Sequence, residues 1–119
     1  NKDGYKFKKS YPYTTGKNTL GLNCLNDCNF NYPSKYSKFL LRGYGHVSTF
    51  STKKGINGLY DMGGNVWEWV DINDNSNKGT KGGSWWYGKN QMIQGYNATK
   101  PKNMSAVYIG FRCVKDFKN

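Results

Sequence analysis

The sequence predicts a loop-rich α+β domain with short, twisted antiparallel strands. Glycine supplies 15 of the 119 residues and asparagine is also common, and both favour turns over long helices. No window shows the sustained apolar periodicity of an amphipathic helix. Two segments, 81–87 and 107–115, instead carry apolar and aromatic runs typical of β structure. These observations predict short strands joined by long turns.

The remaining segments are interpreted in chain order. Residues 1–20 are rich in Lys and Tyr and are expected to form an extended N-terminal segment. Val47–Phe50 is a candidate short strand, and residues 57–72 hold the main motif. The polar stretch 73–80 is expected to turn. Residues 88–106, rich in Asn, Lys and Gly, are expected to form a loop.

The length of the chain bounds its organisation. A chain of 119 residues suits one domain with a modest core, and we assign residues 1–119 to a single domain. Hydrophobic residues make up only 36% and aromatic residues 17%, so aromatic rings must supply much of the buried area. The chain starts at Asn1 rather than Met, from which we expect a processed, trimmed or fragmentary chain.

The charge balance is strongly basic, with a net charge of +11 from 18 Lys and Arg against 7 acids. The basic residues are spread along the chain and most are Lys, which is typical of a soluble surface. The same charge leaves open a partner that is nucleic acid, anionic glycan or acidic protein. The even spread argues against sequence-specific nucleic-acid binding. No segment has the length of a membrane span, and no signal peptide is visible.

The three cysteines, Cys24, Cys28 and Cys113, leave two alternatives open. One is a disulfide with one free thiol, as in a secreted protein. The other is three reduced, partly buried thiols. The only histidine, His46, is expected to be a loop residue, and with it the chain lacks the ligands for a closed zinc site. No catalytic triad can be assembled, and we name no catalytic residue.

Three motifs carry a family resemblance. They read Asn-Gly-Leu-Tyr-Asp-Met-Gly-Gly-Asn-Val-Trp-Glu-Trp at 57–69, Gly-Gly-Ser-Trp at 82–85 and Ile-Gly-Phe-Arg at 109–112. Together they resemble the formylglycine-generating enzymes, or sulfatase-modifying factors, a branch of the C-type-lectin-like folds. The resemblance covers roughly residues 11–115, which correspond to the C-terminal half of that domain. It implies a partner chain that supplies the first half, a trimmed remnant or a minimal version.

The main motif also predicts a calcium site. Asp61 and Glu68 bracket a turn whose glycines let the backbone fold back closely. Carboxylates and backbone carbonyls suit a hard cation such as calcium. The resemblance implies calcium held by Asp61, Gly64, Val66 and Glu68, with Gly64 and Val66 offering carbonyls. The alternative is that the two carboxylates only cap turns or pair with Lys or Arg112.

Five residues are expected to have structural roles. Asn65 should satisfy backbone groups inside its own turn. One of Trp67 and Trp69 should anchor the core while the other lies nearer the surface, on opposite sides of the strand. Trp85 should pack behind the close approach that the preceding glycines permit. Arg112 should make a buried or half-buried ion pair that ties down the last strand.

The resemblance also shows what this chain lacks. Oxygen-dependent members carry two reactive cysteines shortly after Gly-Gly-Ser, with which they bind copper and oxidise a substrate cysteine. The matching positions fall near Tyr87 and Met92, which cannot act as thiolates. Copper is therefore not expected here, and Cys113 is not assigned to catalysis. Related sulfoxide synthases need an iron site made of three histidines. Since His46 is the only histidine, this chain cannot form such a site by itself.

The segment 86–100 is a candidate recognition loop. It is polar, neutral to basic, and rich in Tyr, Asn and Gln, a composition that suits adaptable binding. The variable proteins of diversity-generating retroelements and some phage receptor-binding tips use the same fold for ligand binding. By analogy of position, exposed Trp86, Tyr87, Tyr96 and Asn97 would form a partner-binding surface.

These observations lead to three hypotheses. The preferred one is a non-catalytic binding or structural module that presents this loop to a protein or glycan. Its setting would be extracellular, on a cell surface or a virion, and calcium would stiffen it. The second is part of a copper-dependent formylglycine-generating-type oxidase completed by a missing chain. The third is a basic scaffold subunit that contacts acidic protein or nucleic acid.

Overall fold

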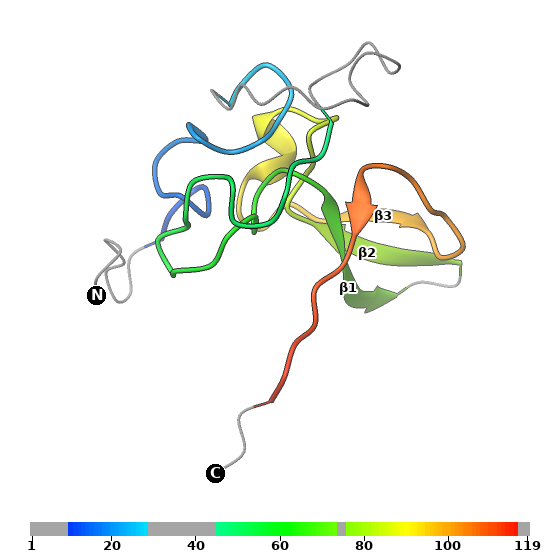
Figure 1. Ribbon diagram of the computed structural model, residues 1–119. Coiled ribbons are helices and arrows are strands. Elements are labelled where there is room, and N and C mark those ends of the chain that lie inside the picture. Colours follow the sequence, from blue (N-terminus) through cyan, green and yellow to red (C-terminus); the bar gives the residue numbers. More distant parts are fainter. Residues whose placement is uncertain (1–9, 29–44, 74–75, 117–119) are drawn as a thin grey trace.

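The computed structural model describes residues 10–28, 45–73 and 76–116. Regular structure is sparse and gathers in the second half of the chain (Figure 1). It consists of one 3₁₀ turn, η1 (Lys89–Met92), and a four-stranded sheet made of β1 (Trp67–Asn73), β2 (Asn77–Lys81), β3 (Ala98–Pro101) and β4 (Ile109–Gly110). The described ranges contain no α-helix, so the α part of the predicted α+β class is not seen there.

The sheet has the order β3-β2-β1-β4. β2 pairs antiparallel with β1, where Trp69 lies opposite Thr80, and antiparallel with β3 on its other side. β4 runs parallel to β1, with Trp67 opposite Ile109. The prediction of antiparallel strands is therefore correct for β1 to β3 and wrong for β4. A parallel neighbour needs a crossover connection, and the chain after β3 crosses to the far edge of the sheet.

Several predicted element boundaries were wrong. Segment 81–87 is a strand only at Lys81, because Gly82 adopts a left-handed φ of +96° and turns the chain out of β2. Segment 107–115 is a strand only at Ile109–Gly110, and Val47–Phe50 forms none. The polar stretch 73–80 contains most of β2.

The segment predicted as a loop, 88–106, contains both η1 and β3. Residues 10–20 show turns and a single bridge between Tyr13 and Gly16, while residues 1–9 of the expected N-terminal segment lie outside the described residues. In β2 and β3, pairing with neighbouring strands decides the structure, because the side chains themselves are mostly polar.

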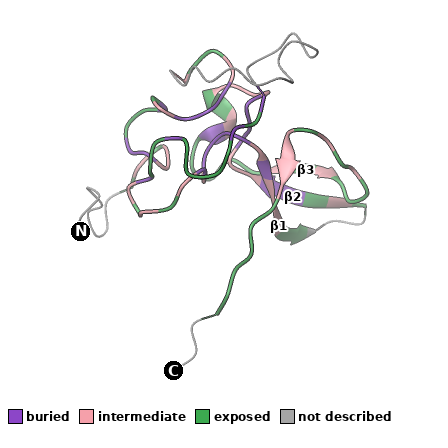
Figure 2. Cartoon of the chain, in the orientation of Figure 1, coloured by how far each residue is buried: buried purple, intermediate pink, exposed green. Residues whose placement is uncertain are grey.

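Trp67 and Trp69 have the unequal burial that was predicted. Trp67 is 1% exposed and Trp69 is half-buried. Their expected placement on opposite sides was wrong, because residues two apart in a strand share a face. Their burial differs because Trp67 starts β1, where the sheet meets the loops, and Trp69 lies further along the strand (Figure 2).

The core lies at this junction between sheet and loops (Figure 2). Trp67, Trp85 and Leu22 are almost fully buried. Leu22 also packs with Cys24 and Met92, and Tyr13 and Cys28 cover that cluster. Cys24 and Cys28 form a disulfide, while Cys113 is a free, exposed thiol. Of the two alternatives for the cysteines, the structure therefore has the disulfide.

Asn65 joins several loops through one residue. It is buried and left-handed, with φ of 64°. Its side-chain Oδ1 accepts hydrogen bonds from Asn23 Nδ2 at 3.1 Å and from the Val47 amide at 2.9 Å, and its Nδ2 donates to the Val47 carbonyl at 3.2 Å. Its backbone amide donates to Asn23, and its carbonyl accepts from Trp85. The prediction that Asn65 satisfies its own turn was therefore wrong, because its side chain bonds to the distant segments at Asn23 and Val47.

The close approach around Asn65 requires glycine at position 64. Gly64 has φ of +75°, and a Cβ atom there would lie 2.6 Å from the carbonyl oxygen of Asn23. Its amide donates to the Gly82 carbonyl at 2.7 Å, which links the main motif to the end of β2. Any side chain at this position would separate the two loops.

We expect Asn65→Ala to lower the free energy of unfolding by at least about 3 kcal/mol. The change leaves buried groups of Val47 and Asn23 without partners, at about 1–3 kcal/mol each. It also removes the polar side chain that lets asparagine tolerate left-handed backbone. Urea unfolding measures the loss. Asn97→Ala, at an exposed asparagine, is the matched control and should cost less than about 0.5 kcal/mol. Equal losses in the two variants would contradict the role of Asn65.

Candidate functional site

The two carboxylates of the main motif have different partners. Asp61 is buried, and Thr52 Oγ1 donates to its Oδ1 at 2.5 Å. Glu68 lies on β1 and accepts two hydrogen bonds from Arg112, one from Nε to Oε1 and one from Nη2 to Oε2 at 2.8 Å. Arg112 Nη2 also donates to the Tyr60 carbonyl at 2.9 Å. The guanidinium therefore joins the segment after β4 to both ends of the motif.

The ion pair is partly exposed, with side-chain exposures of 36% for Arg112 and 14% for Glu68. Its hydrogen bond to Glu68 raises the pKa of Arg112, burial lowers it, and the charges of Glu68 and Asp61 raise it further. The predicted ion pair of Arg112 is confirmed, but its predicted burial holds for Glu68 alone, because Arg112 is exposed. It holds the exposed C-terminal segment rather than a long last strand (Figure 1).

The predicted calcium ligands fit a hard cation by donor type. The carbonyls of Gly64 and Val66 accept no hydrogen bond from any residue that the structure describes. Asp61, Val66 and Glu68 line one cavity of about 390 Å³. Arg112 engages both oxygens of Glu68, but each carboxylate oxygen has a second lone pair for a metal. Clusters of three or more His, Cys, Asp or Glu are absent from the described ranges, so carbonyls would have to complete the site.

The predicted partner-binding residues divide into two groups. Tyr87 packs edge-on against Trp67 at 5.2 Å between ring centroids and against Tyr108 at 5.7 Å. Trp86 lies 5.6 Å from Tyr108 and 5.1 Å from Trp85. Trp86 and Tyr87 are therefore half-buried, and the prediction that they are exposed was wrong. The turn after β2 folds them onto Tyr108, a contact between distant segments that no local pattern marks.

Tyr96 and Asn97 are exposed, as predicted. Tyr96 is 41% exposed and its ring lies 6.4 Å from that of buried Trp67. Ile93 is exposed beside it, at 43%. We call residues 93–97 the loop surface. Its turn is closed by a hydrogen bond of 2.9 Å from the Tyr96 amide to the Ile93 carbonyl.

A lysine covers the rings behind the loop surface. Lys100 Nζ lies 4.5 Å from the ring centroid of Trp67 and 5.5 Å from that of Tyr87, as a cation–π contact. Burial lowers the pKa of Lys100. These contacts hold the rings in place behind the exposed tyrosine.

Other positions named from the sequence have simpler surroundings. Met92 is buried in the core cluster, and His46 is exposed in a loop stretch. Three residues that the sequence did not single out have roles here: Thr52 holds Asp61, Asn23 holds Asn65, and Tyr108 holds the rings. None belongs to the three motifs, so only the folded geometry identifies them. No helix in the described ranges is long and apolar enough to cross a membrane.

Comparison with known proteins places this geometry in a family. Residues 4–117 match the domain family described as sulfatase-modifying factor enzyme 1-like. This match implies a C-type-lectin-like fold, in agreement with the loops and short strands seen here. No curated protein is similar enough to match the chain.

A double-mutant cycle should detect the Glu68–Arg112 pair. Arg112→Lys removes the two-point geometry, and Glu68→Gln removes the charge. Because the pair is partly exposed, we expect a coupling energy of about 0.5–1 kcal/mol in urea unfolding. Lys102→Gln, at an exposed lysine, should show no coupling with Glu68→Gln. Additive losses for Arg112 and Glu68 would show that the two side chains act independently.

Proposed function

The chain belongs to the sulfatase-modifying factor enzyme 1-like family, and we propose that it is a non-catalytic binding module whose loop surface contacts a protein or glycan partner. One observation carries the proposal. The positions that match the reactive cysteines of oxygen-dependent members hold Tyr87, packed between rings, and Met92, packed in the core. Next to them, Tyr96 and Asn97 are exposed. Packed side chains thus replace the reactive thiols, and exposed residues suited to binding a partner lie next to them.

The loop surface is well suited to recognition. Tyr96 offers contact area with few rotatable bonds, and Asn97 offers an amide donor and acceptor. Buried Trp67 supports the Tyr96 ring from behind. The Gln94 amide donates to the Pro12 carbonyl at 2.8 Å and ties the loop to the N-terminal segment. A loop held in this way loses little conformational entropy on binding.

Calcium is proposed as a structural ion in the main motif. The carboxylates of Asp61 and Glu68 and the carbonyls of Gly64 and Val66 would hold it. A bound cation would neutralise Asp61, share Glu68 with Arg112, and join the motif loop to the start of β1. The carbonyls of Gly64 and Val66, which have no described donor, support this proposal.

An extracellular setting, on a cell surface or a virion, is also part of the proposal. Its support is the disulfide between Cys24 and Cys28, because such bonds persist in oxidising compartments. The basic charge of +11 would favour partners with acidic surfaces in that setting.

Partner binding should depend on Tyr96 and Asn97. We expect Tyr96→Ala with Asn97→Ala to weaken binding on a glycan array at least tenfold, as for truncated contact residues at an interface centre. Phe50→Ala, at an aromatic residue that is 73% exposed and outside the loop, is the matched control and should bind normally. Trp86 and Tyr87 are unsuitable for this test, because their truncation would disturb the ring cluster.

Two results would contradict the binding proposal. Copper-dependent oxygen uptake with a thiol peptide would identify the chain as part of a formylglycine-generating-type oxidase. Unchanged array binding by the Tyr96 and Asn97 double variant would also overturn the proposed surface.

Calcium should raise the thermal midpoint of unfolding. At tenfold excess over the dissociation constant, a bound ion stabilises by about 1.4 kcal/mol. Differential scanning fluorimetry with and without a chelator measures the shift. Glu68→Gln should reduce the shift, whereas Asp71→Asn, at an exposed acid that is not among the proposed ligands, should keep it. A midpoint that does not respond to calcium in the unaltered chain would refute the site.

A further inference from the structure

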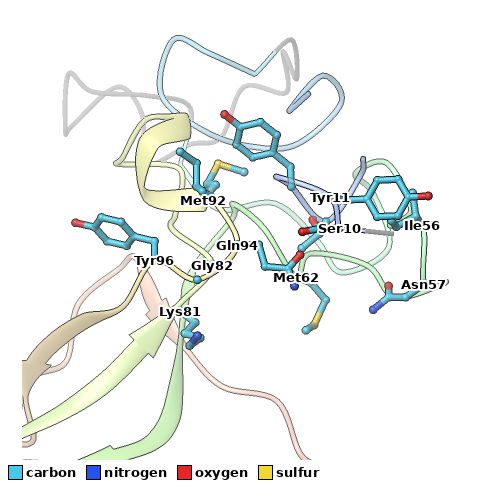
Figure 3. A pocket seen from close by; sticks show the side chains of 14 residues that line it. Ser10, Tyr11, Ile56, Asn57, Met62, Lys81, Gly82, Met92, Gln94 and Tyr96 are labelled. Carbon is cyan, nitrogen blue, oxygen red and sulfur yellow. The ribbon is translucent and has the colours of Figure 1, made fainter. Parts of the chain in front are cut away.

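We propose that the pocket beside the loop surface binds an acidic monosaccharide unit, a pyranose ring that carries a carboxylate. The pocket has a volume of about 380 Å³, within the range of about 300–1,000 Å³ for small-molecule sites. Met92 and Tyr96 lie on one side of it and Ile56 and Asn57 on the other, with Lys81 at the end of β2 (Figure 3). The inference rests on the proposed binding function and names its ligand class.

Backbone hydrogen bonds fix the walls of this pocket. The Gln94 amide donates to the Pro12 carbonyl at 2.8 Å, and the Ile56 amide donates to the Thr14 carbonyl at 2.9 Å. Just after β2, a Cβ atom on Gly82 would lie 2.8 Å from the Met62 carbonyl oxygen. Glycine at position 82 therefore allows the backbones at Gly82 and Met62 to approach closely. Four segments, at 12–14, 56–62, 82 and 94, thus meet around the cavity. A pocket formed in advance in this way binds a small ligand without ordering its own loops.

Lys81 lies at the edge of the pocket, where its charge would favour an anionic ligand (Figure 3). It is the one cation among the described lining residues, and no described lining residue carries a carboxylate. Glu68 lies opposite Lys81 across the β1–β2 pair, but Arg112 already engages both oxygens of Glu68. The Lys81 ammonium group has no hydrogen-bond or ion-pair partner among the residues that the structure describes. A bound carboxylate would supply its counter-ion.

The other lining groups favour a sugar over other acids. Tyr13 and Tyr96 supply apolar ring faces on which the C–H face of a pyranose can pack. The Gln94 side chain offers both a donor and an acceptor. Asn57 uses its Oδ1 to accept from the Leu59 amide, which leaves its Nδ2 donor for a ligand. The side-chain amides of Gln94 and Asn57 can together hydrogen-bond several hydroxyl groups. A sugar has such groups and a simple aromatic acid lacks them.

The pocket and the loop surface are continuous at Tyr96, which belongs to both. An acidic unit in the pocket would therefore leave the rest of a glycan over Tyr96 and Asn97. Asn97 does not line the pocket, and Lys81 is not part of the loop surface. The two residues allow separate tests of pocket and surface.

Calorimetry on the full chain with glucuronate, N-acetylneuraminate, methyl glucoside and benzoate tests the inference. The two acidic sugars should bind at least tenfold more tightly than methyl glucoside, and more tightly than benzoate. Lys81→Gln should weaken glucuronate binding at least tenfold. Lys102→Gln, at an exposed lysine outside this pocket, should bind glucuronate normally. Equal binding of methyl glucoside, or of benzoate, would overturn the ligand class.

A second variant guards against misfolding. Gln94→Ala should also weaken glucuronate binding, while its circular dichroism spectrum and that of Lys81→Gln match the unaltered chain. Normal glucuronate binding by folded Lys81→Gln would overturn the pocket. The proposed function would still stand if Asn97→Ala weakened array binding. Conversely, loss of glucuronate binding on Lys81→Gln, with normal array binding by Asn97→Ala, would support the pocket and reject the loop surface.

Discussion

The described fold depends on the polar contacts of one buried asparagine. Because the described ranges contain only short strands and one 3₁₀ turn, backbone groups in their loops need partners outside regular structure. Asn65 provides them for the loops at Asn23 and Val47, and its carbonyl receives the amide of Trp85. Hydrogen bonds between loops here do the work that helices and sheets do in most domains. Their geometry requires left-handed backbone at Asn65 and glycine at the preceding position.

The same contacts position the candidate site. The bond from Asn65 holds Trp85, whose neighbour Trp86 packs on Tyr108, and Tyr108 in turn supports Tyr87. Rings rather than regular elements thus transmit rigidity from the motif to the loop surface. Arg112 binds both Glu68, 44 residues away in sequence, and the Tyr60 carbonyl, 52 residues away. The recognition surface therefore lies on a support fixed by side chains from distant segments.

Motifs with fixed spacing were the most informative part of the sequence. They indicated the family, the packing of Trp67 and Trp85, and an ion pair for Arg112. Strand boundaries failed, because β2 is polar and forms through pairing on both sides, and because β4 ends after two residues. The exposure of Trp86 and Tyr87 could not be predicted, since it depends on Tyr108. That the charge of Lys81 has no partner among the described residues could not be predicted either. It depends on the long-range pairing of Glu68, its neighbour across the sheet, with Arg112.

The brevity of β4 has a consequence for association between chains. β4 pairs with β1 only at Trp67 and Glu68, and the chain then departs with Phe111 and Val114 exposed at 77% and 87%. The rest of that edge of β1 can pair with a strand of another chain, and apolar side chains nearby would stabilise the contact. The net charge of +11 makes copies of the chain repel one another, which opposes indiscriminate stacking. Ionic strength should therefore govern how readily copies of this domain adhere to one another.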